Sequence, residues 1–387
     1  MNAASYPLLQ VSLFALSAIS FLLLIYPYLI YPLILRLFPK HPREKVLDSG
    51  SKHPSVALLF CAYNEERSLP AKIDNIRQIK RCYPKLEVRA YADCCTDRTL
   101  PLLLAAADVL KVHEGRQRAG KAAGMRELVN ATKADILVFS DANVMLAPEA
   151  IPRIVSYFDD PNVGTVAGTL HYTNPGDGQV AKTGSLYWRL EELIKRLESA
   201  TGSTMGADGS IFAMRRSLYP IVPTDLLDDM IASINPMFSG YRVISATDVH
   251  AFEKSTTDTG DEFRRKRRIA CRAFNSHRHL AAQLRATSTL NRFKYISHKY
   301  LRWFSPVFLL LGLAFSVAGI AVMAGWPVAL IFLVAGIGTL IVGLQLNIPL
   351  LGVIAEILLS FVAVGFGVIE AIAGRNYQIW NPAKSRE

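Results

Sequence analysis

Long apolar stretches flank a middle region in which short apolar runs alternate with amphipathic ones. The apolar stretches cover Tyr6–Phe38, Trp303–Ala324, Pro327–Leu346 and Leu350–Ala373. Because about 20 apolar residues span a bilayer, they predict one N-terminal and two to three C-terminal transmembrane helices. The last stretch contains Glu356 and ends near Glu370, so it either crosses the membrane or lies in its interface.

The middle region predicts an α/β fold. Its apolar runs indicate strands at Val56–Phe60, Glu87–Ala92, Val109–His113, Asp135–Phe139 and Gly164–Tyr172, and its amphipathic runs indicate helices at Ser68–Cys82, Leu100–Ala107, Gly120–Ala131 and Pro148–Phe158. Strands that alternate with helices are typical of a parallel sheet.

Polar residues follow three of these predicted strands. Asp141 and Asn143 come directly after the fourth strand, and Asn64 and Asp93 follow the first and second. Ligands of open α/β sheets bind beyond the carboxyl ends of strands. Carboxylate and amide oxygens suit Mg²⁺ or Mn²⁺, so we expect a nucleotide and a metal here. Helix capping by Asp141 and a turn role for Asn64 are the structural alternatives.

Positive charge is concentrated before the C-terminal apolar stretches. The chain carries a net charge of +11, and the segment 263–302 contains twelve Lys and Arg residues without one acid. This segment leads into an apolar stretch, which favours anionic membrane lipids over nucleic acid as its partner. Arg36 and Lys40 follow an uncharged N-terminus, which predicts that the middle region lies on the cytoplasmic side of the inner or plasma membrane. Arg375, Lys384 and Arg386 favour a tail on the same side, whereas three crossings by the C-terminal stretches would place it outside.

Several motifs strongly resemble those of the membrane-bound family 2 inverting glycosyltransferases, the relatives of cellulose, hyaluronan and poly-N-acetylglucosamine synthases and of ceramide glucosyltransferase. They are Ala62-Tyr63-Asn64-Glu65-Glu66, Asp93 with Thr96-Asp97-Arg98-Thr99, Gly120-Lys121-Ala122-Ala123, Asp141-Ala142-Asn143, Gly206–Arg216, and Asp228-Asp229. The resemblance covers residues 54 to 275.

This resemblance implies a GT-A fold (a Rossmann-like nucleotide-binding sheet), a UDP- or GDP-sugar donor, and Mg²⁺ or Mn²⁺. It implies that Asp229 is the catalytic base and that Asp141 and Asn143 hold the metal. The donor side comprises Ala62, Asn64, Glu65, Asp93, Lys121 and Asp141; the acceptor side comprises Asp208, Gly209, Asp228, Arg265 and Arg268. The structural alternative for Asp228 and Asp229 is a solvated helix start.

Three departures from the family pattern matter. Arg126 replaces the Asn that often follows the Gly120-Lys121 segment. Asn143 replaces the second carboxylate of the DxD motif, from which we expect weaker metal binding. The QxxRW signature of processive synthases reads Arg265-Lys266-Arg267-Arg268-Ile269, which argues against polymerisation. We therefore expect transfer of one sugar to a lipid-linked or exopolysaccharide acceptor at the membrane surface. A processive synthase and a catalytically weak scaffold subunit are the alternatives.

These expectations divide the chain into five parts. They are an N-terminal transmembrane helix (1–39), a cytoplasmic glycosyltransferase domain (40–262), a basic amphipathic interface segment (263–302), the C-terminal membrane segments (303–373) and a tail (374–387).

Overall fold

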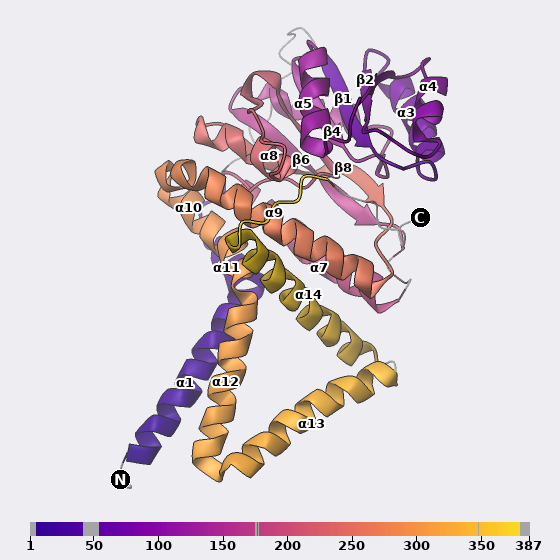
Figure 1. The fold of residues 1–387 in the computed structure, drawn as a ribbon. Coiled ribbons are helices and arrows are strands. Elements are labelled where there is room, and N and C mark those ends of the chain that lie inside the picture. Colours follow the sequence, from indigo (N-terminus) through magenta and orange to yellow (C-terminus); the bar gives the residue numbers. More distant parts are fainter. Residues whose placement is uncertain (1–4, 42–53, 175, 177, 347, 380–387) are drawn as a thin grey trace.

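A mixed β-sheet lies at the centre of the computed structural model, which describes residues 5–41, 54–174, 176, 178–346 and 348–379 (Figure 1). The eight strands lie in the order β3-β2-β1-β4-β7-β6-β8-β5. Their bounds are β1 Val56–Ala62, β2 Glu87–Ala92, β3 Lys111–Glu114, β4 Ile136–Ser140, β5 Met145–Leu146, β6 Val163–Tyr172, β7 Ile211–Arg215 and β8 Arg242–Glu253.

The first four strands in space are parallel. β1 pairs in parallel with β2 and β4, and β2 pairs in parallel with β3. β7 then runs antiparallel to both β4 and β6, while β6 and β8 are parallel. The carboxyl ends of β1, β2 and β4 therefore open at one edge of the sheet, as the sequence predicts.

Both faces of the sheet are covered because successive side chains of a strand point to opposite faces. Leu58 and Phe60 of β1 belong to an apolar cluster with α3, α4 and α6. Leu59 and Cys61 belong to a second cluster with α5, α8 and α9. The helices are α3 Leu69–Cys82, α4 Thr99–Ala105, α5 Lys121–Ala131, α6 Ala150–Ser156, α7 Gln179–Ala200, α8 Asp228–Phe238 and α9 Thr259–Ala286, with 3-10 turns at Tyr157–Asp159 and Arg216–Leu218.

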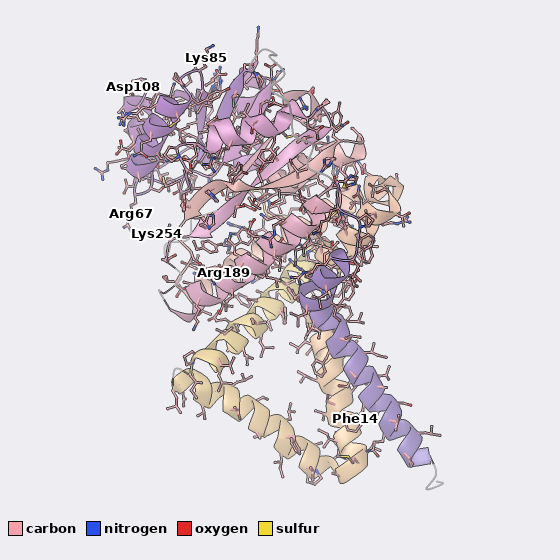
Figure 2. All side chains as sticks on the ribbon, turned by 180° about the vertical axis from the view of Figure 1, so that it is seen from behind. Phe14, Arg67, Lys85, Asp108, Arg189 and Lys254 are labelled. Atoms are coloured by element: carbon pink, nitrogen blue, oxygen red, sulfur yellow. The ribbon has the colours of Figure 1, made fainter. Side chains whose placement is uncertain are left out.

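Three helices of the described residues are long and apolar enough to cross a membrane. They are Pro7–Leu35, Ser305–Ala324 and Pro349–Ile372, and Trp326–Val342 is a shorter apolar helix. The elements are α1 Ser5–Ile25, a π-turn Tyr26–Ile30, α2 Tyr31–Leu35, α10 Thr289–Tyr295, a π-turn Ile296–Tyr300, α11 Leu301–Trp303, α12 Ser305–Ala324, α13 Trp326–Gln345 and α14 Pro349–Ile372. Figure 2 shows that side chains on α1, α12 and α13 are almost all carbon, whereas nitrogen and oxygen crowd the sheet domain.

Small residues bring α1 and α12 together below the sheet domain (Figure 1). Ser17 Oγ donates to the carbonyl of Gly312 at 3.0 Å and lies 2.7 Å from Ser316 Oγ. The ring of Phe14 covers Gly319, where a Cβ would meet it at 3.1 Å. Small residues at such crossings allow close packing of membrane helices.

The last helix, α14, returns to the sheet domain and packs along α9 (Figure 1). Its two acids meet α9, because Glu356 accepts from Thr259 Oγ1 at 2.8 Å and Glu370 accepts from Arg267 Nε at 2.9 Å. Beyond it, Gln378 Nε2 donates to the carbonyl of Ala119 at 3.2 Å. The described part of the tail therefore lies beside the sheet domain.

Candidate active site

A cavity of about 1600 Å³ opens at the carboxyl end of β4 and extends towards the apolar helices. Ten of the predicted site residues line it, namely Glu65, Lys121, Asp141, Asn143, Asp208, Gly209, Asp228, Asp229, Arg265 and Arg268. Arg67 and Lys254, at one edge of the sheet domain in Figure 2, also line it. Ala62, Asn64 and Asp93 are not among the lining residues.

One lysine lies among the carboxylates that are predicted to bind the donor and to act in catalysis. Lys121, the first residue of α5, places Nζ 2.6 Å from Asp141 Oδ1 and 3.9 Å from Asp228 Oδ2. Burial disfavours its charge, but Asp141, Asp228 and Asp229 together raise the pKa of Lys121. The ammonium group therefore stays protonated at the centre of three acids.

The two acids at the start of α8 have different surroundings. Asp228 is buried and lies 3.7 Å from Arg272 Nη2. Asp229 accepts a hydrogen bond from the backbone N–H of Met230 at 2.7 Å. Burial and the neighbouring Asp228 raise the pKa of Asp229 to about 6. A carboxylate with a pKa close to the working pH is suited to accept a proton.

Gly209 leaves the space in which these groups meet. A Cβ at this position would lie 2.8 Å from Lys121 Nζ, 3.2 Å from Asp229 Oδ2 and 3.4 Å from Asp141 Oδ2. These distances show that the backbone of the segment before β7 passes directly beside the charged groups. Any side chain here would push them apart.

The loop that carries Asp141 and Asn143 is hydrogen-bonded to a buried lysine that no sequence motif indicates. Lys72 of α3 is fully buried and donates to the carbonyl of Val144 at 2.6 Å and to Ser140 Oγ at 3.2 Å. Burial lowers the pKa of Lys72 to about 7, and Asp141 opposes this shift. No local pattern could reveal the contact, because α3 and this loop are about 70 residues apart in the sequence.

Asn64 and Asp93 form the loops around the cavity. Asn64 has a positive φ of 51°, and its side chain both donates to Thr96 Oγ1 and accepts from the Thr96 backbone, each at 2.9 Å. Asp93 has no exposed surface and accepts from the backbone N–H groups of Ala119 and Gly120 at 2.8 and 3.0 Å. Asp93 thus holds the loop directly before Lys121, whereas Asn64 ties the loop after β1 to the loop after β2. Ala62 is buried in the sheet.

The residues predicted for the acceptor side lie in the loop before β7, on α8 and on α9. Asp208 accepts from Lys195 Nζ of α7 at 2.9 Å. Burial opposes its charge, but Lys195 and Ser210 lower the pKa of Asp208. Arg265 and Arg268 face the cavity from α9, so the boundary predicted at residue 263 falls inside this helix.

The donor set suits a hard cation. Asp141 supplies a carboxylate and Asn143 an amide, both oxygen ligands that Mg²⁺ and Mn²⁺ accept, and Lys121 already places a positive charge on Asp141. Within the described part of the chain, no three acidic, histidine or cysteine side chains converge on one ion position. These residues therefore fit a metal ion whose remaining ligands come from a bound substrate or water.

The comparisons with known proteins agree on the family. Residues 58–220 match the sequence model of Glycosyl transferase family 2. The undecaprenyl-phosphate 4-deoxy-4-formamido-L-arabinose transferase of Yersinia pestis (strain Pestoides F) is 31% identical over 174 residues, which cover 42% of this chain and 49% of that protein. The enzyme of the same name from Yersinia enterocolitica serotype O:8 is 27% identical over 178 residues, covering 44% and 52%. The chain thus spans about half the length of the curated relatives it matches.

A solved structure shows the same fold over nearly the whole chain. It is the mannosyltransferase PcManGT from Pyrobaculum calidifontis, in complex with GDP-Man and Mn²⁺, with a TM-score of 0.71 and 20% identity over 94% of this chain and 99% of that one. The predicted GT-A fold with flanking apolar helices is confirmed.

Proposed function

Because residues 58–220 form a glycosyl transferase family 2 domain, we propose that the protein transfers a sugar from a UDP- or GDP-sugar to a lipid-linked acceptor, with inversion at the anomeric carbon. The observation that carries this proposal is the convergence of Lys121, Asp141, Asp228 and Asp229 around Gly209 in one cavity. These are the groups that an inverting transfer needs.

Asp229 acts as the general base. The acceptor hydroxyl attacks the anomeric carbon, its proton moves to the carboxylate of Asp229, and the bond between the anomeric carbon and the diphosphate oxygen breaks. One carboxylate suffices because no covalent intermediate forms. Its raised pKa supports this role, since a more basic carboxylate is a better proton acceptor at neutral pH.

Lys121 and Asp141 serve the leaving diphosphate. Mg²⁺ or Mn²⁺ bound by Asp141 and Asn143 would neutralise the negative charge that develops on the diphosphate. The ammonium group of Lys121 stays charged and adjoins Asp141, so it adds a second positive charge where the donor binds. Asp93 keeps the start of α5 in place by accepting from the backbone of Ala119 and Gly120.

The lining of the cavity supports a lipid-linked acceptor. Its far end is formed by apolar side chains of α1 and α14, among them Leu24, Ile25, Ile357, Phe361 and Val364. A soluble sugar acceptor has no use for such a surface, whereas a lipid tail would bury apolar area there. The basic segment on α9 would then contact anionic headgroups, with the catalytic domain on the cytoplasmic side of the inner or plasma membrane.

A second candidate is transfer to the phosphate of a lipid phosphate. The names of the curated relatives favour it, and so does Arg302. This residue lines the cavity, and its buried Nε and Nη2 have no hydrogen-bond partner among the residues that the structure describes. A phosphate oxygen is already ionised, so that reaction would not need Asp229 as a base.

The test uses the full chain in liposomes with a panel of UDP- and GDP-sugars, with and without Mn²⁺. We expect one donor to release its nucleotide in a metal-dependent reaction and to label a lipid-extractable product. Cleavage of the labelled sugar by mild acid would identify a glycosyl phosphate and favour the second candidate. If no donor released its nucleotide in the presence of bacterial lipid extract, both candidate functions would be contradicted and the scaffold alternative would be favoured.

A further inference from the structure

The amide of Asn143 is paired with a carboxylate from a distant strand. Asn143 stands where the family motif has its second Asp, and its Nδ2 donates to Glu253 Oε1 at 3.0 Å. Glu253 is the last residue of β8, is only 6% exposed and lines the same cavity as Asp141.

This contact fixes which way the Asn143 amide points. A carboxylate only accepts hydrogen bonds, so the nitrogen of the amide must face Glu253 and the oxygen must face elsewhere. The amide oxygen is the atom of this side chain that ligates a hard cation. Glu253 therefore acts on the metal motif through the orientation of Asn143.

The residue types at positions 143 and 253 are also compatible in charge. An Asp at position 143 would bring two carboxylates within hydrogen-bond distance, where their like charges would repel each other. With Asn at 143, the site keeps one carboxylate on the strand-end loop at Asp141 and one on β8 at Glu253. The second acid of the motif is thus displaced from residue 143 to residue 253.

We propose that Glu253 is a positioning residue for the metal site: it orients Asn143 and supplies the negative charge that this Asn lacks. The inference rests on the proposed function, because it concerns the same metal ion. On this proposal the metal motif draws its negative charge from two elements, and Asn143 alone does not weaken metal binding.

A rival role for Glu253 is to balance a cation. The guanidinium of Arg265 pairs with Glu262 at 3.4 Å and is also attracted by the negative charge of Glu253. If Glu253 served only to balance Arg265, changing residue 143 would not restore Mn²⁺ binding in a variant that lacks the Glu253 carboxylate. An exchange of the two groups separates the roles.

The experiment measures Mn²⁺ binding by electron paramagnetic resonance in the full chain, with MnCl₂ alone and then with UDP or GDP. We expect Glu253→Gln to weaken Mn²⁺ binding by about 10- to 100-fold, as is usual for groups that orient metal ligands. Asn143→Asp alone should not tighten binding. The exchange Asn143→Asp with Glu253→Gln should return affinity to within about threefold of the wild type. Glu149→Gln, on a half-exposed glutamate that pairs with Arg153, is the control.

Equal Mn²⁺ binding by wild type and Glu253→Gln would overturn the inference while leaving the proposed function intact. Failure of the exchange variant to recover, with a thermal unfolding midpoint like that of the wild type, would also overturn it. Absence of Mn²⁺ binding in the wild type, with either nucleotide, would overturn the metal-dependent function itself and this inference with it.

Discussion

The ammonium nitrogen of Lys121 lies 2.6 Å from Oδ1 of Asp141, so the first residue of α5 is joined to the residue that follows β4. The same nitrogen adjoins Asp228, and a Cβ on Gly209 would collide with it. Lys121 is therefore the common neighbour of the donor-side and catalytic groups, and changes at this residue should affect both.

Replacing Lys121 by Met should weaken donor binding and shift the pH profile. A hydrogen bond to a charged group contributes about 1.5–3 kcal/mol, so we expect KM for the donor to rise roughly 10- to 100-fold. Lys121 also lowers the pKa of Asp229, so the acidic limb of kcat/KM should move to higher pH. Lys121→Arg keeps the charge and should move this limb less. An unchanged limb in Lys121→Met would show that the ammonium does not act on the base.

The wild-type enzyme should lose activity as the pH falls through about 6. Asp229 accepts a proton only as the carboxylate, and its pKa is raised from 3.8 to about 6. The value of kcat/KM should therefore rise with pH up to about 6 and level off above it. A profile that stays flat down to pH 4 would contradict the assignment of this base.

Gly209→Ala should abolish catalysis with little effect on folding. The added methyl group would lie 2.8 Å from Lys121 Nζ and 3.2 Å from Asp229 Oδ2, so the lysine ammonium group would have to move from its place beside the acids. We expect kcat to fall at least about 100-fold, since small misplacements of reacting groups have this effect. Gly336→Ala on α13, which meets open space, is the matched control. Near-normal kcat in Gly209→Ala would show that the groups act from other positions.

Gln378→Ala should test the contact between the tail and the loop that precedes α5. The Gln378 side chain donates to the carbonyl of Ala119. The backbone carbonyl oxygen of Gln378 lies so close to Gly120 that a Cβ at that position would clash with it. Loss of one such hydrogen bond costs about 0.5–1.5 kcal/mol, so KM for the donor should rise by about two- to tenfold while kcat stays the same. Gln345→Ala, at the end of α13, should leave both constants unchanged. Equal KM values for the wild type and Gln378→Ala would mean that this contact does not contribute to donor binding.

The sequence predicted those parts of the site that local patterns encode. The apolar run before Asp141 identified β4, and the carboxyl ends of parallel strands placed Asn64, Asp93 and Asp141 at one edge of the sheet. Asp229 came from resemblance rather than from pattern, because two acids at a helix start are also a common solvated arrangement.

The remainder depends on contacts between residues far apart in the sequence. Strand β8 follows a break after the parallel strands and pairs with β6, and only this pairing brings Glu253 to Asn143, 110 residues earlier. Strand β7 lies within the motif Gly206–Arg216, which is not among the predicted strands. Lys72 gave no signal because a lysine in an amphipathic helix usually points to solvent. Such partners become visible only when the elements are packed.

Single-turnover sugar transfer by the wild type and by Asp229→Asn tests the central claim most directly, with donor binding measured calorimetrically on the same preparations. Asn keeps the size of the side chain but cannot take the proton. The account predicts that Asp229→Asn binds the nucleotide sugar within about threefold of the wild type and transfers it at least about a thousandfold more slowly. Transfer at the wild-type rate would contradict the role of Asp229 and would favour an acceptor that needs no base.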